Sequence, residues 1–103
     1  MSGFDNTSFT VRTATGTTDT VLATDSVIIY TNTSAKAVTL PAITSFTPGR
    51  LFSFVNTATG AATITSTGAT IDGAATYVVP ATLGRVQLVN DGTNWFSISE
   101  VVV

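Results

Sequence analysis

The chain contains no cysteine and no histidine, and charged residues make up only 10% of its 103 residues. Without cysteine it can form neither disulfides nor thiolate sites. Without histidine it lacks the commonest general base, and both of the usual nitrogen and sulfur ligands of zinc are missing. These absences disfavour catalysis and metal binding, and we expect no enzyme, no metal site and no cofactor.

The carboxylates provide little further evidence for a catalytic or metal-binding site. No segment supplies more than one of them within four residues, whereas a calcium site needs several oxygen ligands at close spacing. Asp72 and Asp91 each precede a glycine, a pairing that turn geometry explains. A glycosidase would need two carboxylates facing each other across a bond, which only a tertiary structure can reveal.

Positive charge and long apolar runs are also scarce. The formal net charge is -2, and the four basic residues are spread along the chain. Phosphate neutralisation needs clustered lysines or arginines, so we expect no nucleic-acid partner. No apolar run approaches 18 residues, so no membrane span is expected either.

What the chain does contain is threonine, valine and isoleucine. Its 22 threonines lie mostly between valines and isoleucines, and 44% of the residues are hydrophobic. These β-branched residues suit a pleated strand and lose rotamer freedom in a helix. No window shows apolar residues at helical spacing over three turns. The composition predicts one folded, all-β domain.

Short apolar runs between turn-forming residues predict eight or nine strands. Such spacing is typical of a small antiparallel β-sandwich or jelly-roll-like domain, here covering residues 9–103. Residues 1–8 are expected to form an N-terminal arm, and Thr15–Thr20 a loop. The segment 25–31 is apolar enough to be buried on both faces. Strands are expected at 9–13, 25–31, 37–40, 51–55, 62–65, 70–73 and 76–79, followed by a hairpin within 85–99.

The hairpin gives the clearest local signal, because alternating apolar residues flank Asp91-Gly92. A two-residue loop would divide these apolar residues between the two faces. A three-residue loop over 90–92, with Gly92 left-handed, would gather them on one core face. The burial pattern favours the second register, in which Trp95 stands on the opposite face. The residues gathered on the core face would be Val86, Leu88, Phe96 and Ile98.

Four residues are candidates for contact with a partner: Phe4, Phe9, Arg12 and Trp95. Tryptophan and arginine are enriched in protein interfaces, and each basic residue is conspicuous in so weakly charged a chain. Phe4 and Phe9 would leave apolar area in water unless the arm docks on a partner or folds back on its own subunit. Trp95 is covered either by its own subunit or by a neighbouring one. At this point both alternatives stay open.

A series of short motifs runs in order through about four fifths of the chain. They are Leu22-Ala23-Thr24-Asp25, Val38-Thr39-Leu40-Pro41, Pro48-Gly49-Arg50, Val55-Asn56, Thr63-Ile64-Thr65, Ile71-Asp72-Gly73 and Val86-Gln87-Leu88-Val89-Asn90-Asp91-Gly92-Thr93-Asn94-Trp95. Taken together, they resemble a small β module of bacteriophage virion proteins, especially tail-fibre and head-decoration proteins.

The resemblance implies a structural module that assembles, often as trimers, and catalyses nothing. A tail fibre would carry the module beside a shaft and a receptor-binding tip, whereas this chain is almost nothing but the module. We therefore expect a capsid decoration (cement) protein, a homotrimer on the capsid surface of a virion, bound to the major capsid protein. A tail or head-fibre component is the alternative, and a carbohydrate-binding module is the third.

Overall fold

The computed structural model describes residues 10–101, with the backbone alone for residues 99–101. Within this range there are nine strands, one short 3-10 helix and no α-helix, which confirms the all-β class. The elements are β1 (Val11–Ala14), β2 (Thr18–Thr20), β3 (Val27–Tyr30), β4 (Lys36–Leu40), η1 (Ile43–Ser45), β5 (Leu51–Asn56), β6 (Ala62–Ser66), β7 (Thr76–Val79), β8 (Gly84–Asn90) and β9 (Trp95–Val101).

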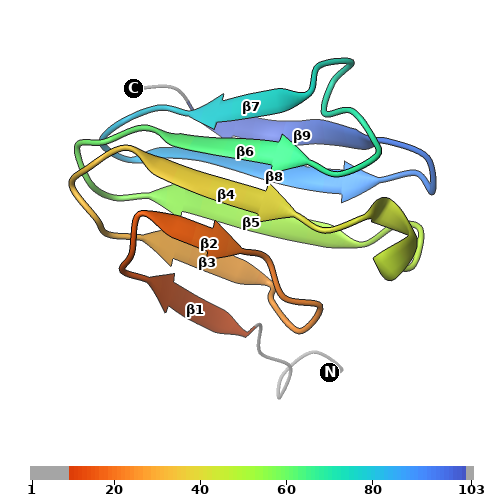
Figure 1. Cartoon of the computed structure of the whole chain (residues 1–103), viewed down its shortest axis with the longest axis horizontal. Helices are drawn as coiled ribbons and strands as arrows, with labels where there is room; N and C mark the ends of the chain where they lie inside the picture. Colours follow the sequence, from red (N-terminus) through yellow and green to blue (C-terminus); the bar gives the residue numbers. More distant parts are fainter. Residues whose placement is uncertain (1–9, 102–103) are drawn as a thin grey trace, which may run out of the picture.

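The first six strands alternate between two sheets (Figure 1). Sheet A has the order β1-β3-β5-β8-β9, and sheet B has the order β2-β4-β6-β7. Between two consecutive strands of one sheet, the chain in this part forms one strand of the other sheet. It therefore re-enters the first sheet in the same direction, and the neighbouring strands pair in parallel. Antiparallel pairing is confined to β5–β8, β8–β9 and β6–β7. The expectation of antiparallel pairing throughout is therefore wrong for the first half of the chain.

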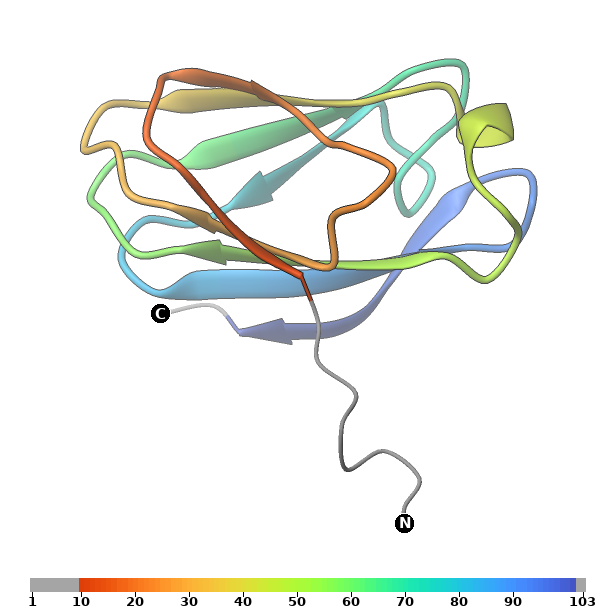
Figure 2. The same cartoon turned by 90° about the horizontal axis from the view of Figure 1, so that it is seen from below.

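The two sheets lie as two layers, with buried side chains between them (Figure 2). Alternate residues of each strand point inward, and burying one Ile, Leu or Phe contributes about 1.5–3 kcal/mol. This alternation decides which face of every strand belongs to the core. The fully buried side chains include Ile28, Tyr30, Val38, Leu40, Phe52, Phe54, Ile64, Ile71, Val79, Leu88 and Trp95.

Strand β2 was expected to be a loop. Its middle residue, Asp19, pairs in register with the buried Val38 of β4, so a carboxylate occupies the inward position. The apolar alternation that identifies a strand is consequently absent from its sequence. In β3, expected to be buried on both faces, the outward residues Val27 and Ile29 are only half-buried.

At one end of the core a buried lysine ties two turns together. Lys36 is only 3% exposed, and its ammonium group donates to the carbonyl oxygens of Ser34 at 3.1 Å, Gly60 at 2.7 Å and Asn32. Burial lowers the pKa of Lys36. The three carbonyls satisfy the donors that burial would otherwise leave unpaired.

The hairpin is confirmed, but its predicted register is wrong. Asn90 pairs with Trp95 and Leu88 with Ser97, so the loop spans four residues, 91–94. An even-numbered loop gives the parity opposite to the one expected. Trp95 is therefore completely buried, whereas Phe96 is 41% and Ile98 58% exposed.

The aromatic residues of the core explain this choice of face. The Trp95 ring lies 5.7 Å from that of Phe46 and 5.8 Å from that of Phe52, both in tilted or edge-on geometries that aromatic pairs prefer. The backbone of Trp95 is also bound by the loop before β7, since its N–H donates to the carbonyl of Thr70 at 2.8 Å. Each parity of this strand begins with an aromatic residue, Trp95 or Phe96, and the larger ring occupies the core.

Gly92 has a φ of +97°, which confirms the expected positive backbone angle although the loop is longer. We predict that Gly92→Val lowers the free energy of unfolding by at least about 1–2 kcal/mol, because a side chain is strained at this angle. Its Cβ would also lie 3.4 Å from Pro48 Cγ. Urea unfolding measures the loss. Gly16→Val is the matched control, since Gly16 has no positive φ and its Cβ would have no neighbour closer than 3.6 Å. Equal losses in both variants would contradict the prediction.

Candidate functional site

Of the four residues that were predicted to contact a partner, the structure describes Arg12 and Trp95 and places them far apart in sheet A. Phe4 and Phe9 lie outside the described residues. Arg12 lies on edge strand β1, and Trp95 lies in the core at the start of β9, the edge strand at the other side of sheet A. The expected outward orientation of Trp95 is wrong, and a fully buried side chain offers a partner no surface.

Arg12 is held between two carboxylates of its own chain. Its Nη1 donates to Asp19 Oδ1 at 2.7 Å, and its Nη2 donates to Asp25 Oδ2 at 2.8 Å. Its Nε donates to Asp25 Oδ1 at 3.0 Å. The backbone N–H of Leu22 also donates to Asp25, and the hydroxyl of Tyr30 donates to Asp19 at 3.1 Å. Arg12, Asp19, Asp25 and Tyr30 form what we call the edge network.

The protonation states in the edge network follow from these contacts. Burial alone would raise the pKa of Asp25, but the hydrogen bonds from Arg12 and Leu22 and the charge of Arg12 outweigh it, so that the pKa is lowered. Hydrogen bonds to Asp25 and Asp19 raise the pKa of Arg12. Burial raises the pKa of Tyr30, with the charge of Asp19 adding to the effect, so the hydroxyl stays neutral and can donate.

The edge network closes the open end of the core. Arg12 pairs in register with the buried Ile28, and Asp19 with the buried Val38, so both face inward from the outermost strands of the two sheets. Charged side chains in this position satisfy each other's hydrogen bonds. Apolar side chains there would favour the binding of another strand that covers them. The network therefore has a structural role, and it discourages pairing along the β1 and β2 edges.

The outer face of sheet A carries apolar side chains outside the core. Its residues line up in three rows across the strands. The row that begins at Leu51 is apolar, and each of the other two rows contains two apolar and two polar residues. Three of the six exposed large hydrophobic residues in the described part of the chain lie on this face: Val11, Phe96 and Ile98. The rows are Leu51–Val89–Phe96, Val11–Val27–Ser53–Gln87 and Thr13–Ile29–Val55–Arg85.

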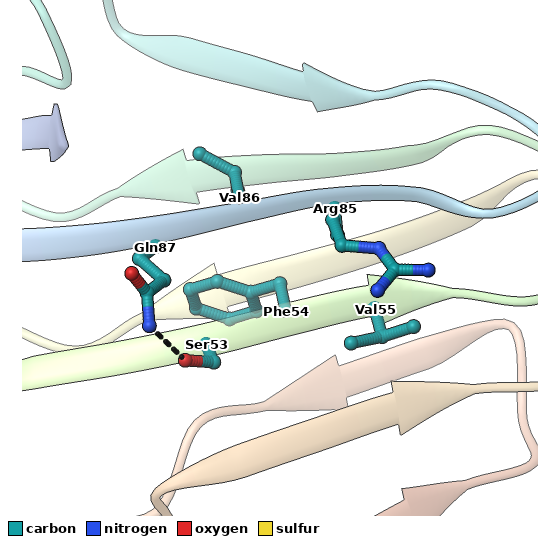
Figure 3. A pocket seen from close by; sticks show the side chains of 6 residues that line it. All are labelled: Ser53, Phe54, Val55, Arg85, Val86 and Gln87. Carbon is teal, nitrogen blue, oxygen red and sulfur yellow. Dashed lines mark hydrogen bonds between the residues drawn. The ribbon is translucent and has the colours of Figure 1, made fainter. Parts of the chain in front are cut away.

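Two adjoining hollows lie on this face, with volumes of about 310 Å³ and 470 Å³. Ser53 and Gln87 line both of them. Figure 3 shows the smaller hollow, where the Gln87 amide donates to Ser53 Oγ at 3.1 Å beside Val55 and Arg85. The larger hollow lies toward the start of β3 and β5 and includes Val27 and Leu51. Both hollows therefore have mixed walls: apolar side chains stand beside the shared Ser53–Gln87 pair, and each hollow also includes an arginine, Arg85 in the smaller and Arg50 in the larger.

The outer face of sheet B has different chemistry. It presents threonine hydroxyls and no charged side chain, because Asp19 and Lys36 of its strands point inward. Threonine hydroxyls are readily solvated, so this face has little to gain from being covered. Its two rows are Thr20–Thr39–Thr65–Thr76 and Thr18–Ala37–Thr63–Val78.

The remaining polar groups form turns. Asp91 Oδ1 accepts from the backbone N–H groups of Thr93 and Asn94, both at 2.9 Å, and these bonds lower the pKa of Asp91. Asp72 accepts from the N–H and hydroxyl of Ser97. Residues 10–101 contain no group of three or more histidine, cysteine, aspartate or glutamate side chains that could hold a metal ion. In the same range no helix is long and apolar enough to cross a membrane.

Sequence reasoning missed the outer face of sheet A as a site. The signal was present, because Val27, Ile29, Leu51 and Val55 make both parities of β3 and β5 apolar. For residues 25–31 that pattern predicts burial on both faces, an expectation that does not by itself require a partner.

No model of a known protein family matches this chain, and no curated protein matches it.

The edge network gives a prediction for stability. Asp25→Asn should lower the free energy of unfolding by about 1.5–3 kcal/mol, because it weakens hydrogen bonds to a charged group in a buried position. Since folding lowers the pKa of Asp25, the parent should also lose this stabilisation as the pH falls below 3.8, the ordinary value, while the variant should not. Thermal unfolding measured between pH 2 and pH 7 tests both statements.

Asp91→Asn is the control for this experiment. Asp91 is exposed, and an asparagine oxygen can accept the same two backbone hydrogen bonds. If Asp25→Asn were no more destabilising than Asp91→Asn, the edge network would not hold the end of the core.

Proposed function

We propose that this chain is a structural protein of a bacteriophage virion, a capsid decoration (cement) protein that binds the assembled shell as a homotrimer. Its two-sheet domain would be a sandwich-type module of the kind that the motifs resemble. It would act mechanically, by burying surface across the seams between subunits of the major capsid protein. Because it would bind the assembled lattice and not its separate parts, it would stabilise that lattice by mass action.

The outer face of sheet A is the observation that carries this proposal. It is a broad, mainly apolar surface in a chain whose described charges are few and mostly bound internally. Apolar surface of this kind is typical of a protein that works by association. By contrast, the described carboxylates are engaged in turns or in the edge network, and none of them faces a hollow.

The carbohydrate-binding alternative has less support. Such modules present several exposed aromatic rings on one face, and among the aromatic residues of the described range only Phe96 is classed as exposed. The rings of Phe52, Phe54 and Trp95 are fully buried. We therefore retain the virion role and keep the tail or head fibre as its runner-up.

The location on the particle is the first test. We predict that electron microscopy of intact virions shows the protein at the symmetry axes of the capsid, and that particles stripped of it become less resistant to heat. Density confined to the tail would instead favour the fibre component. Absence from the particle would overturn the proposal.

The arm gives a second test. We predict that deleting residues 1–8 weakens co-sedimentation with stripped capsids but leaves the melting temperature of the free protein nearly unchanged. Ordering these residues costs roughly 1–2 kcal/mol each, which one Phe4 side chain, worth about 1.5–3 kcal/mol, does not offset without further contacts. Equal sedimentation would exclude the arm from attachment. A large fall in melting temperature would mean that it packs on its own subunit.

A further inference from the structure

We propose that the outer face of sheet A binds a second copy of this chain, with Phe96 and Ile98 of one copy entering the larger hollow of the next. The proposal goes beyond the capsid role by naming the surface through which copies contact each other. A face that is complementary to itself joins two copies about a two-fold axis, so this contact is separate from the trimer of the proposed function. Self-association through this face can be tested without any capsid.

The face is complementary to itself. Phe96 and Ile98 project from β9 at one side of it, and they are 41% and 58% exposed. The larger hollow, of about 470 Å³, lies toward the other side, between β3 and β8. A surface that carries both a projecting apolar pair and a hollow lined partly by apolar side chains can bind a copy of itself by placing one in the other.

Within one chain, Ile98 cannot reach Val27 on the far wall of the larger hollow, although Gln87 of the neighbouring strand β8 lines the near wall. Strands β5 and β8 separate β3 from β9, so Val27 and Ile98 lie three strand spacings apart. At about 4.8 Å per spacing the separation is about 14 Å. Only a neighbouring molecule can bring these side chains together.

The other described surfaces are less suited to association. The outer face of sheet B carries rows of solvated threonines, and inward charges at Arg12 and Asp19 guard the β1 and β2 edges. The first residues of β9 already bind the Thr70–Asp72 loop: Trp95 N–H donates to Thr70, and Asp72 N–H donates to the Trp95 carbonyl. Among these surfaces, the outer face of sheet A is therefore the one best suited to association.

Size favours a second copy as the occupant, and charge opposes it only weakly. Two chains of formal net charge -2 repel each other weakly, and the arginines that line the hollows of the face are Arg50 and Arg85. Arg50, which lines the larger hollow, bonds to the carbonyls of Ala23, Leu51 and Asp25 of its own chain. The molecule measures 40 × 31 × 22 Å, and the face is perpendicular to the shortest of these dimensions (Figures 1 and 2). It is broad enough for a standard contact of about 800 Å² per partner.

Engineered cysteines test the contact directly, because the chain contains none of its own. We expect the double variant Val27→Cys/Ile98→Cys to form covalent oligomers on a non-reducing gel after mild oxidation. The two Cα atoms within one chain exceed the limit of about 7 Å for a disulfide, so any bond between these positions joins two molecules. Mass spectrometry of the linked peptides would identify the 27–98 pair.

The matched control is Thr20→Cys/Thr76→Cys on the outer face of sheet B. These positions belong to one row and are likewise separated by two intervening strands, β4 and β6. We expect few covalent oligomers from this variant. Equal cross-linking in the two variants would show random collision, and no cross-linking in the first would show that the face does not meet a second copy. Either result overturns the proposal.

Light scattering provides a measurement without cysteines. At high micromolar concentration we expect the parent to have a mass that is a multiple of 10.6 kDa. Ile98→Lys should weaken association at least tenfold, and Thr39→Lys, on sheet B, should leave it unchanged. A monomeric parent, or an oligomer indifferent to Ile98→Lys, would overturn the self-contact. If that monomer still bound particles, the capsid role would stand, whereas self-association without particle binding would overturn only the role.

Discussion

The ion pairs of Arg12 with Asp19 and Asp25 hold together the end of the molecule where β1 and β2, the outermost strands of the two sheets, leave the core uncovered. In a fold where strands alternate between two sheets, the outermost strand of each sheet has an inward face but no further strand beyond it. Apolar residues there would expose the core at its edge. A half-buried arginine that bridges two carboxylates fills the space, satisfies its own hydrogen bonds and disfavours the binding of another strand.

Because its charges are used in this way, the protein has two outer faces of contrasting chemistry. Sheet B presents threonines to solvent, and sheet A presents valine, isoleucine, leucine and phenylalanine around the Ser53–Gln87 pair. The same alternation that builds the core creates this contrast, since inward positions are apolar on both sheets and only the outward positions differ. That difference between the outward positions is the basis on which association through sheet A is proposed.

The site was only partly predictable, and the hairpin shows why. Its turn residues and its strands could be recognised locally, because Asp91-Gly92 and the flanking alternation act within a few residues. The face on which Trp95 lies could not, because the residue after Trp95 on its own face is Ser97, whereas Phe96 and Ile98 make the other face the more apolar one. The choice was made by Phe46 and Phe52, more than 40 residues away in the chain, whose rings receive the indole. Choosing the core face of a strand by counting its apolar residues gives the wrong answer when the more apolar face is exposed to solvent or covered by a partner.

The sequence by itself determined the all-β class, the positions of most strands and turns, and the positive backbone angle of Gly92, because β-branched residues, prolines and glycines act on their own backbone. The tertiary structure alone decided that neighbours in the first half pair in parallel, that Thr18–Thr20 is a strand, and that Arg12 meets Asp19 and Asp25. It also decided which apolar rows face outward. These features depend on contacts between segments distant in the chain, and no local pattern specifies which segment will provide the partner.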